Sequence, residues 1–321
     1  MTLPMPSFYD PQSAAELYVE RTAMVARAAI QYREHHNIRP SSSDETRVAA
    51  FGIDVQVGFC LPGSSLFVPG AVEDTRRTLG WLYSNLDKIT TLYFSLDTHH
   101  IRQIFHPAWW VDGAGNHPAP LTVISVQDVR EGRWIPVSHK ERALEYCEKL
   151  EASGKYVLTV WPYHTLLGGL SHALVPSMME ATIFHTIARG KQTHFEVKGT
   201  HPHTENYSVL SPEVRELEGC DVGDFNDDLF SSLMSHDRVY VFGQAKSHCV
   251  LSTLHDLEER IRDTDPALAS KVYVLTDAMS PVPAPPIEPL PQGLDFPAIA
   301  DAAMKRFEEA GFNIVSCGDP L

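Results

Sequence analysis

Residues 238–249 read Arg-Val-Tyr-Val-Phe-Gly-Gln-Ala-Lys-Ser-His-Cys, and they join a β-rich apolar run to the start of a helical pattern. The run at 238–242 is short and largely apolar, which is typical of a strand that is buried on both faces of a parallel sheet. The helical pattern covers 248–263 and has Cys249 at its beginning. A strand that leads through a loop into a helix is the repeating unit of a parallel α/β fold.

The same alternation extends along most of the chain. Further β-rich apolar runs lie at 48–53, 91–96, 156–160, 194–197 and 272–275. Other helical patterns lie near 71–86, 139–153, 174–189, 224–235 and 297–310. The sequence therefore predicts an α/β fold, a three-layer sandwich with a mostly parallel central sheet and helices on both faces.

The beginning of the chain lies outside this alternation. Apolar residues recur at roughly helical spacing over 13–34, and the polar stretch 40–45 is typical of a linker. We therefore expect an N-terminal helical extension and linker over 1–45 and one catalytic domain over 46–321. The extension and the proline-rich stretch 280–296 are expected to serve packing or contacts within a homo-oligomer.

Composition excludes several classes of partner. A formal net charge of −15 over 321 residues argues against a nucleic acid, whose phosphates would be repelled. No apolar run approaches membrane-spanning length, and the beginning of the chain has no signal-peptide pattern. The five cysteines are irregularly spaced and predict no disulfide framework, so we expect a reducing, cytoplasmic location.

Chemically active side chains follow five successive runs. In a parallel sheet, ligands bind beyond the carboxyl ends of the strands, so the residues there should meet at one edge. The residues that directly follow the runs include Asp54, then Asp97 and His99, then His164, then Lys198, and finally Cys249. We expect them to share one site.

Cys249 is the strongest candidate for a nucleophile. A helix start carries partial positive charge and free N–H groups, which can lower a thiol's pKa and hold an oxyanion. Cys60 is the rival, because it is also close to the expected edge, but it follows a loop aromatic and not a helix start. A lone cysteine is otherwise read as a small buried hydrophobic residue.

No histidine is required by the sequence to be the base for this thiol. Asp54 and Lys198 could instead form a cluster with Cys249, in which the carboxylate accepts the thiol proton and later passes it to the leaving amine. The ammonium would stabilise both charges. Taken alone, Asp54 would be read as a structural cap and Lys198 as a surface charge.

Asp97 and His99 are candidate metal ligands, and His164 and His106 could complete the set. Such Asp/His sets suit Zn²⁺, with Fe²⁺ or Mn²⁺ as alternatives, and leave positions open to water or substrate. Metallophosphoesterases also begin with Asp-x-His and later use Gly-Asn-His, which occurs here at 115–117. Their intervening Gly-Asp element is absent, so we set that interpretation aside.

Together these segments resemble the nicotinamidases, within the isochorismatase-like cysteine hydrolase family, from about residue 48 to 250. The matching motifs are Asp54-Val-Gln-x-x-Phe59-Cys60, Asp97-Thr-His99, Trp161-Pro-x-His164, Lys198-Gly199 followed by Tyr207-Ser208, and Gly243-x-Ala245-x-x-His248-Cys249-Val250. The position of His106 is similar to that of an additional histidine in some members.

The resemblance implies a metal-containing amide hydrolase that converts nicotinamide and water to nicotinate and ammonia through a thioester. It assigns a role to each group of residues. The implied sets are a catalytic triad of Asp54, Lys198 and Cys249; an oxyanion hole of the Ala245 and Cys249 N–H groups; substrate contacts from Phe59, Trp161 and Tyr207; and metal ligands Asp97, His99 and His164, with His106 as an additional candidate. A cis peptide between Gln244 and Ala245 is implied as well.

The sequence departs from the family pattern at several places. Val57-Gly58 stands where Asn-Asp is usual, Thr165 replaces a common cysteine, and Lys246-Ser247 replaces Thr-Asp. Residues 107–155 form a long insertion that could cover or reshape the pocket. Two alternatives therefore stay open: an amidase of the family that acts on another small carboxamide, and a non-catalytic, metal-binding, oligomeric relative.

Overall fold

The computed structural model describes residues 2–284, 290 and 293–321, and its centre is one sheet of six parallel strands. The strands lie in the order β12-β11-β10-β1-β2-β7. Their bounds are β1 Val48–Ile53, β2 Thr91–Asp97, β7 His194–Lys198, β10 Arg238–Gly243, β11 Val272–Leu275 and β12 Asn313–Val315. The predicted parallel sheet is confirmed.

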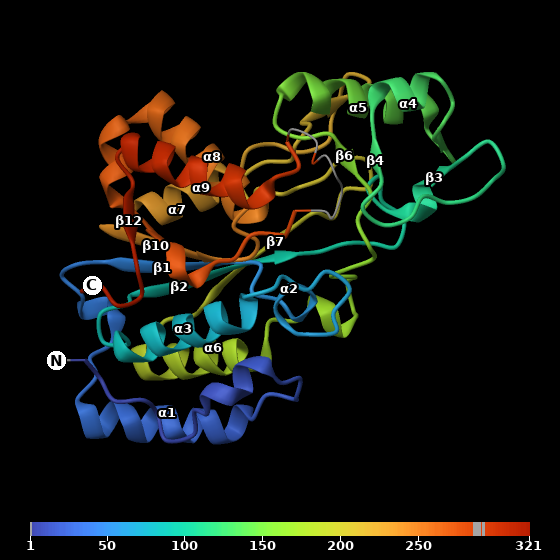
Figure 1. Ribbon diagram of the computed structural model, residues 1–321. Helices are drawn as coiled ribbons and strands as arrows, with labels where there is room; N and C mark the ends of the chain where they lie inside the picture. The colour runs from blue at the N-terminus through green and yellow to red at the C-terminus, as the bar shows by residue number, and fades with distance from the viewer. Residues whose placement is uncertain (1, 285–289, 291–292) are drawn as a thin grey trace.

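Helices cover both faces of this sheet, as Figure 1 shows. On one face lie α7 (Asp227–Met234), α8 (Cys249–Thr264) and α9 (Phe296–Glu309). The other face carries α3 (Ala71–Ser84) and α6 (Pro176–Arg189), and α1 (Thr22–His36) packs on the outside of α6. The predicted three-layer α/β sandwich is therefore confirmed, with α1 added outside one layer.

Strand β1 shows why the sheet needs cover on both sides. All six of its residues are buried. Ala49, Phe51 and Ile53 belong to the core under α8 and α9, whereas Val48 and Ala50 belong to the core under α3 and α6. Successive side chains of a strand point to opposite faces, so a strand between two helical layers is apolar at every position.

The prediction of a sheet strand at 156–160 is wrong. Only Leu158–Thr159 (β6) is a strand, and it pairs antiparallel with Val123–Ile124 (β4), outside the central sheet. Strand β12 was missed for the opposite reason: its three residues are only half-buried and provide no apolar run. In both cases the surroundings, and not the local composition, decide which strand the segment pairs with.

The prediction of one helix over 13–34 is also wrong. A short 3₁₀ turn covers Pro11–Ala15, and α1 begins only at Thr22. Between them, both the backbone N–H and the guanidinium of Arg21 donate hydrogen bonds to the buried carboxylate of Glu180. This tertiary contact fixes an extended conformation before the helix and outweighs the weak helical pattern.

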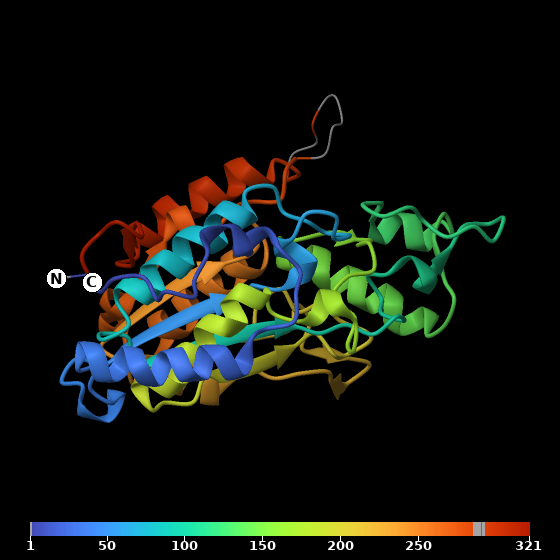
Figure 2. The same cartoon turned by 90° about the horizontal axis from the view of Figure 1, so that it is seen from below.

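The predicted insertion at 107–155 forms a small lobe at one end of the sheet (Figures 1 and 2). It contains the elements β3 (Trp110–Val111), β4, α4 (Val126–Arg130), β5 (Ile135–Pro136) and α5 (Lys140–Ser153). Trp110 and Tyr146 are fully buried in a core that is continuous with the core under α8. The division of the chain at residue 46 stays a prediction.

The remaining α-helix and β-strands of the described residues are α2 (Val57–Cys60), β8 (Glu216–Leu217) and β9 (Cys220–Asp221). The proline-rich stretch 280–296 lies partly outside the described residues, at 285–289 and 291–292. Among the helices of the described residues, none is both long and apolar enough to span a membrane. All five cysteines are described, and none is in a disulfide.

Candidate active site

Lys198 joins the predicted catalytic residues at the carboxyl edge of the sheet. Its Nζ lies 3.0 Å from Asp54 Oδ2, 2.8 Å from Asp97 Oδ1 and 3.6 Å from Cys249 Sγ. These residues come from the end of β7, the end of β1, the end of β2 and the start of α8. One buried ammonium therefore contacts a thiol and two carboxylates that lie far apart in the sequence.

The side chain of Asp54 is oriented by its neighbour strand. The Asp54 N–H donates to Ser95 Oγ at 3.0 Å, and the Ser95 hydroxyl donates to Asp54 Oδ1 at 2.6 Å. Asp54 has a φ of 47°, a left-handed conformation that aspartate tolerates better than most residues. Because Asp54 Oδ1 accepts this hydrogen bond from Ser95, the other carboxylate oxygen, Oδ2, faces the Lys198 ammonium.

The loop between β10 and α8 brings Cys249 to this cluster. Gly243 has a φ of +123°, and a Cβ there would lie 2.0 Å from the Ile53 carbonyl oxygen. Glycine is therefore needed at this turn. The next N–H, of Gln244, donates to the same carbonyl oxygen at 2.9 Å. The Gln244–Ala245 peptide bond is cis, as the resemblance implies.

The backbone N–H groups of Ala245 and Cys249 in this loop have no acceptor among the described residues. Cys249 is the first residue of α8, where N–H groups lack partners within the helix. Ala245 and Cys249 both line a small cavity of about 30 Å³. These donors are thus available to an oxygen atom of a ligand.

The electrostatics of the thiol differ from the sequence-based expectation. Burial raises the pKa of Cys249 well above its ordinary value; Lys198 opposes this effect, and Asp54 and Asp97 add to it. The expected lowering by the helix start is outweighed, because the thiol is desolvated beside two carboxylates. The resting thiol is protonated.

The neighbouring charges have shifted pKa values too. Burial raises the pKa of Asp54, although Lys198 lowers it, so this carboxylate is a stronger base than an ordinary aspartate. Burial alone would lower the pKa of Lys198, but Asp54 and Asp97 raise it well above its ordinary value. A protonated thiol therefore lies beside a basic carboxylate and a permanent cation.

Asp97, His99 and His164 form a group beside the predicted triad that could hold a metal ion. One ligand atom from each lies within 4.8 Å of the other two. Both histidine Nε2 atoms face the same carboxylate oxygen, Asp97 Oδ2, at 2.8 Å for His99 and 3.5 Å for His164. Asp97 thus connects this group to Lys198.

The hydrogen bonds of the two imidazoles fit a metal. His99 Nδ1 is 3.2 Å from the Gly199 carbonyl oxygen and His164 Nδ1 is 2.7 Å from the Pro162 carbonyl oxygen, so Nδ1 is the donor in both. Each Nε2 then carries a lone pair toward Asp97. Burial also lowers the pKa of His99, which keeps that ring neutral. Two imidazoles, each oriented by a backbone carbonyl group, and a carboxylate are a donor set typical of Zn²⁺.

His106 lies near this group without belonging to it. Its ring centroid is 5.8 Å from that of His99 and 6.0 Å from that of His164. Both of its ring nitrogens are buried without a partner among the described residues. Its assignment as an additional ligand stays a prediction.

His164 reaches the site by a route that the sequence did not reveal, since no sheet strand precedes it. The Trp161 N–H donates to the Phe105 carbonyl oxygen at 2.8 Å. On the other side of His164, the His99 N–H donates to the Thr165 carbonyl oxygen at 3.1 Å. These bonds align the segment with the loop that follows β2.

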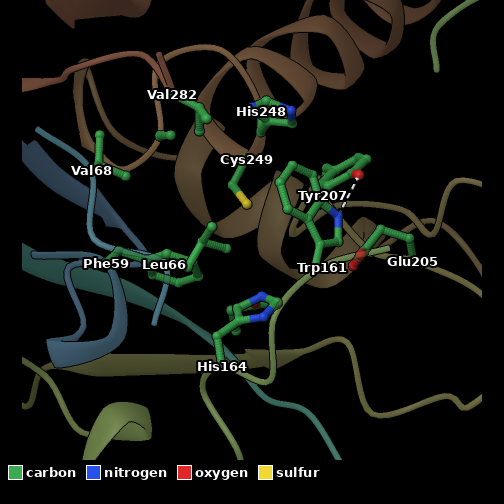
Figure 3. Close-up of a pocket in the computed structure, with 12 residues that line it drawn as sticks. Phe59, Leu66, Val68, Trp161, His164, Glu205, Tyr207, His248, Cys249 and Val282 are labelled. Carbon is green, nitrogen blue, oxygen red and sulfur yellow. Dashed lines mark hydrogen bonds and ion pairs between the residues drawn. The ribbon is translucent and has the colours of Figure 1, made fainter. Parts of the chain in front are cut away.

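The cavity beside Cys249 has mainly apolar and aromatic walls. In Figure 3, Phe59 and Trp161 lie on opposite sides of it, with the Cys249 sulfur facing the space between them. Trp161 Nε1 donates to the Tyr207 hydroxyl at 2.9 Å, which fixes the orientation of the indole ring. The three predicted substrate contacts therefore line one cavity.

Several residues of the site were missed from the sequence. Ser95 orients Asp54, and the Gln56 side chain hydrogen-bonds the backbone of Asp97 through both of its polar atoms. Glu205 and His248 line the cavity. Burial raises the pKa of the Glu205 carboxyl group, which borders the cavity, well above its ordinary value. Gln56 and His248 lie within the matched motifs, although no role was assigned to them. Neither the spacing nor the composition around Ser95 and Glu205 would have identified those two.

Comparison of the sequence with known protein families and with curated proteins finds no match. Solved structures do match. A nicotinamidase/pyrazinamidase from Acinetobacter baumannii is 18% identical with a TM-score of 0.54, over 87% of this chain and 100% of that chain. The yeast nicotinamidase Pnc1p bound to the inhibitor nicotinaldehyde is 16% identical with a TM-score of 0.52, over 84% of this chain and 99% of that chain.

These similarities establish the class of fold. The chain has the three-layer α/β fold of the nicotinamidases, which confirms at the level of the fold the resemblance predicted from the motifs. At identities this low, the likeness does not extend to activity, which depends on the site itself.

Proposed function

We propose that this protein is a nicotinamidase-like cysteine hydrolase of the isochorismatase-like family, which converts nicotinamide and water to nicotinate and ammonia. The observation that carries the proposal is the buried Lys198 ammonium, which contacts the Cys249 thiol and the Asp54 carboxylate beside a small cavity. The fold shared with two nicotinamidases supports it.

Acylation follows from this geometry. Asp54 accepts the thiol proton while Cys249 Sγ attacks the carboxamide carbon, and Lys198 stabilises the charges that develop. The N–H groups of Ala245 and Cys249 donate to the oxyanion. Asp54 then gives the proton to the nitrogen, the C–N bond breaks, ammonia leaves, and an acyl thioester remains on Cys249.

Deacylation uses the same residues in reverse. Asp54 takes a proton from a water molecule as its oxygen attacks the thioester carbon, and the proton returns to the sulfur when the C–S bond breaks. The products are the free carboxylic acid and the protonated thiol, so the enzyme is regenerated. The raised pKa of Asp54 suits a group that must accept and release a proton in both steps.

Asp97, His99 and His164 would hold a divalent metal, for which we favour Zn²⁺ over Fe²⁺ or Mn²⁺. When bound, the ion supplies Lewis acidity at its open positions. Phe59 and Trp161 would stack on the two faces of a flat ring and so present the carboxamide to Cys249.

The direct test is ammonia release from nicotinamide by the purified wild-type protein. We expect turnover that is stoichiometric with nicotinate, measured by a coupled ammonia assay and by chromatography of the acid. Turnover of another small carboxamide alone would favour the second amidase interpretation. No ammonia from any small amide, with metal bound, would favour a non-catalytic relative.

Metal content should depend on His164. We expect about one divalent ion per chain in the wild type and little in His164→Ala, because two remaining ligands bind zinc weakly. Elemental analysis after dialysis measures this directly. His255→Ala, a histidine on α8 outside the group, is the control and should keep the ion. Equal metal in both variants would contradict the assignment.

A further inference from the structure

A groove lies beside the active-site cavity, and the proposed reaction on nicotinamide does not use it. The described residues that line this groove enclose a volume of about 700 Å³. One wall is the antiparallel ribbon of β4 and β6, and the other is Leu294 and Phe296, which lie just before and at the first residue of α9. The groove thus lies between the insertion lobe and the main body of the protein.

The ribbon is apolar on the side where polar residues would be expected. Ile124 and Leu158 point into the core, and the alternate positions are exposed to the groove. Apart from Thr159, which lies opposite Val123, those positions are aliphatic: Leu121, Val123 and Val157 are 52%, 37% and 39% exposed. Antiparallel ribbons with one solvated face usually carry polar residues there, so this face is suited to an apolar ligand.

The inner end of the groove meets the active-site cavity. Tyr207 and His248 line both spaces. The His248 ring lies 5.3 Å from Trp161 on the cavity side and 4.8 Å from Phe296 on the groove side, centroid to centroid. Figure 3 shows His248 and Tyr207 along one border of the cavity. A ligand whose carboxamide lies at Cys249 would therefore lie next to Tyr207 and His248, the two side chains that also line the groove.

The two charged side chains in the described lining of the groove, Glu151 and Lys155, each have a polar partner. Glu151 Oε1 accepts the Val126 N–H at 2.6 Å, and Lys155 Nζ lies 3.6 Å from Asp256 Oδ1. Burial lowers the pKa of His248 to about 4, so this ring is neutral. Most of the described lining is apolar surface.

We infer that the groove binds the apolar extension of a larger primary carboxamide, such as a second aromatic ring attached to the acyl ring. This inference rests on the proposed function for the carboxamide chemistry and adds the substrate class. The extension would contact the aliphatic face of the ribbon and Phe296, and burial of apolar area would favour binding. Because the groove and the cavity share Tyr207 and His248 in their linings, the groove is better placed for part of a substrate than for a separate partner.

The probes are nicotinamide and the phenyl-substituted pyridine-3-carboxamides, with one isomer for each open ring position. The variant Val157→Lys places a charge on the groove face. Val137→Lys is the matched control, because Val137 is also an exposed aliphatic residue near the insertion's strands but does not line the groove. The readout is the ratio of kcat/KM for a phenyl isomer to that for nicotinamide.

We expect at least one phenyl isomer to be hydrolysed at least as efficiently as nicotinamide, and Val157→Lys to lower the ratio about tenfold or more. Val137→Lys should leave it within about twofold. Binding to Cys249→Ala protein, measured by calorimetry, gives the same comparison without turnover. Hydrolysis of nicotinamide with no isomer bound or turned over would overturn the inference and spare the proposed function. Binding of an isomer by a protein that hydrolyses neither this isomer nor nicotinamide would support the groove as a binding site and overturn the proposed function.

Discussion

Replacing Cys249 by alanine is expected to lower kcat for amide hydrolysis by about 10⁴-fold or more, because no other group can form the thioester. Cys60, the rival cysteine, is buried in α2, and burial raises its pKa above its ordinary value. Loss of the thiol removes the nucleophile and leaves the Asp54–Lys198 pair in place. The measurement is steady-state ammonia release, with circular dichroism to confirm the fold.

Cys60→Ala is the control for this substitution. It removes a buried thiol of similar exposure, so any general effect of a small cavity should appear there as well. We expect its kcat to stay within about threefold of the wild type. Activity of Cys249→Ala within about tenfold of the wild type would eliminate the thioester mechanism altogether.

The sequence was sufficient to predict the sheet wherever a strand is buried on both faces. Strands such as β1 and β10 are apolar throughout most of their length, and the functional residues follow them directly: Asp54 after β1, and Cys249 after β10 and its loop. Because the carboxyl ends of parallel strands share one edge, these residues could be placed together without any structure.

The sequence was insufficient where position depends on distant contacts. His164 was expected after a sheet strand, yet it is held by backbone hydrogen bonds to the loops that follow β2. Arg21 ends the extended segment before α1 because of Glu180, which is far away in the sequence. The pKa of Cys249 likewise depends on burial and on two neighbouring carboxylates, and neither is visible in the local sequence.

Lys198→Met is expected to affect both stability and activity. In the wild type the ammonium lies between Asp54 and Asp97, and all three groups are buried. Removing it leaves two carboxylates facing each other without a cation, and losing one partner of a buried ion pair costs about 3–5 kcal/mol of unfolding free energy. Activity should fall together with stability, because the positive charge of Lys198 no longer stabilises the thiolate or the oxyanion.

The stability of this variant should also depend on pH in a specific direction. Without the ammonium, burial and repulsion raise the pKa of Asp54 further in the folded state, and the pKa of Asp97, which His99 and Lys198 lower in the wild type, rises from its low value. Through Asp54, the folded state then binds more protons than the unfolded state. The unfolding free energy of the variant then decreases as the pH rises from about 4, the ordinary pKa of aspartate in the unfolded state, towards the raised pKa in the folded state. Urea titrations at about pH 5 and about pH 8 measure this, and Lys198→Met should lose more stability between them than the wild type.

A double variant separates the charge effect from the loss of packing. Asp54→Asn removes one carboxylate, so the combination of Asp54→Asn with Lys198→Met leaves only Asp97 charged. We expect the double variant to be more stable at about pH 8 than Lys198→Met alone, because the two carboxylates no longer repel each other. If Asp54→Asn and Lys198→Met instead add their individual losses, the two groups do not interact, and the ammonium cannot be the charge that organises this site. Neither variant should recover activity, since both lack a member of the triad.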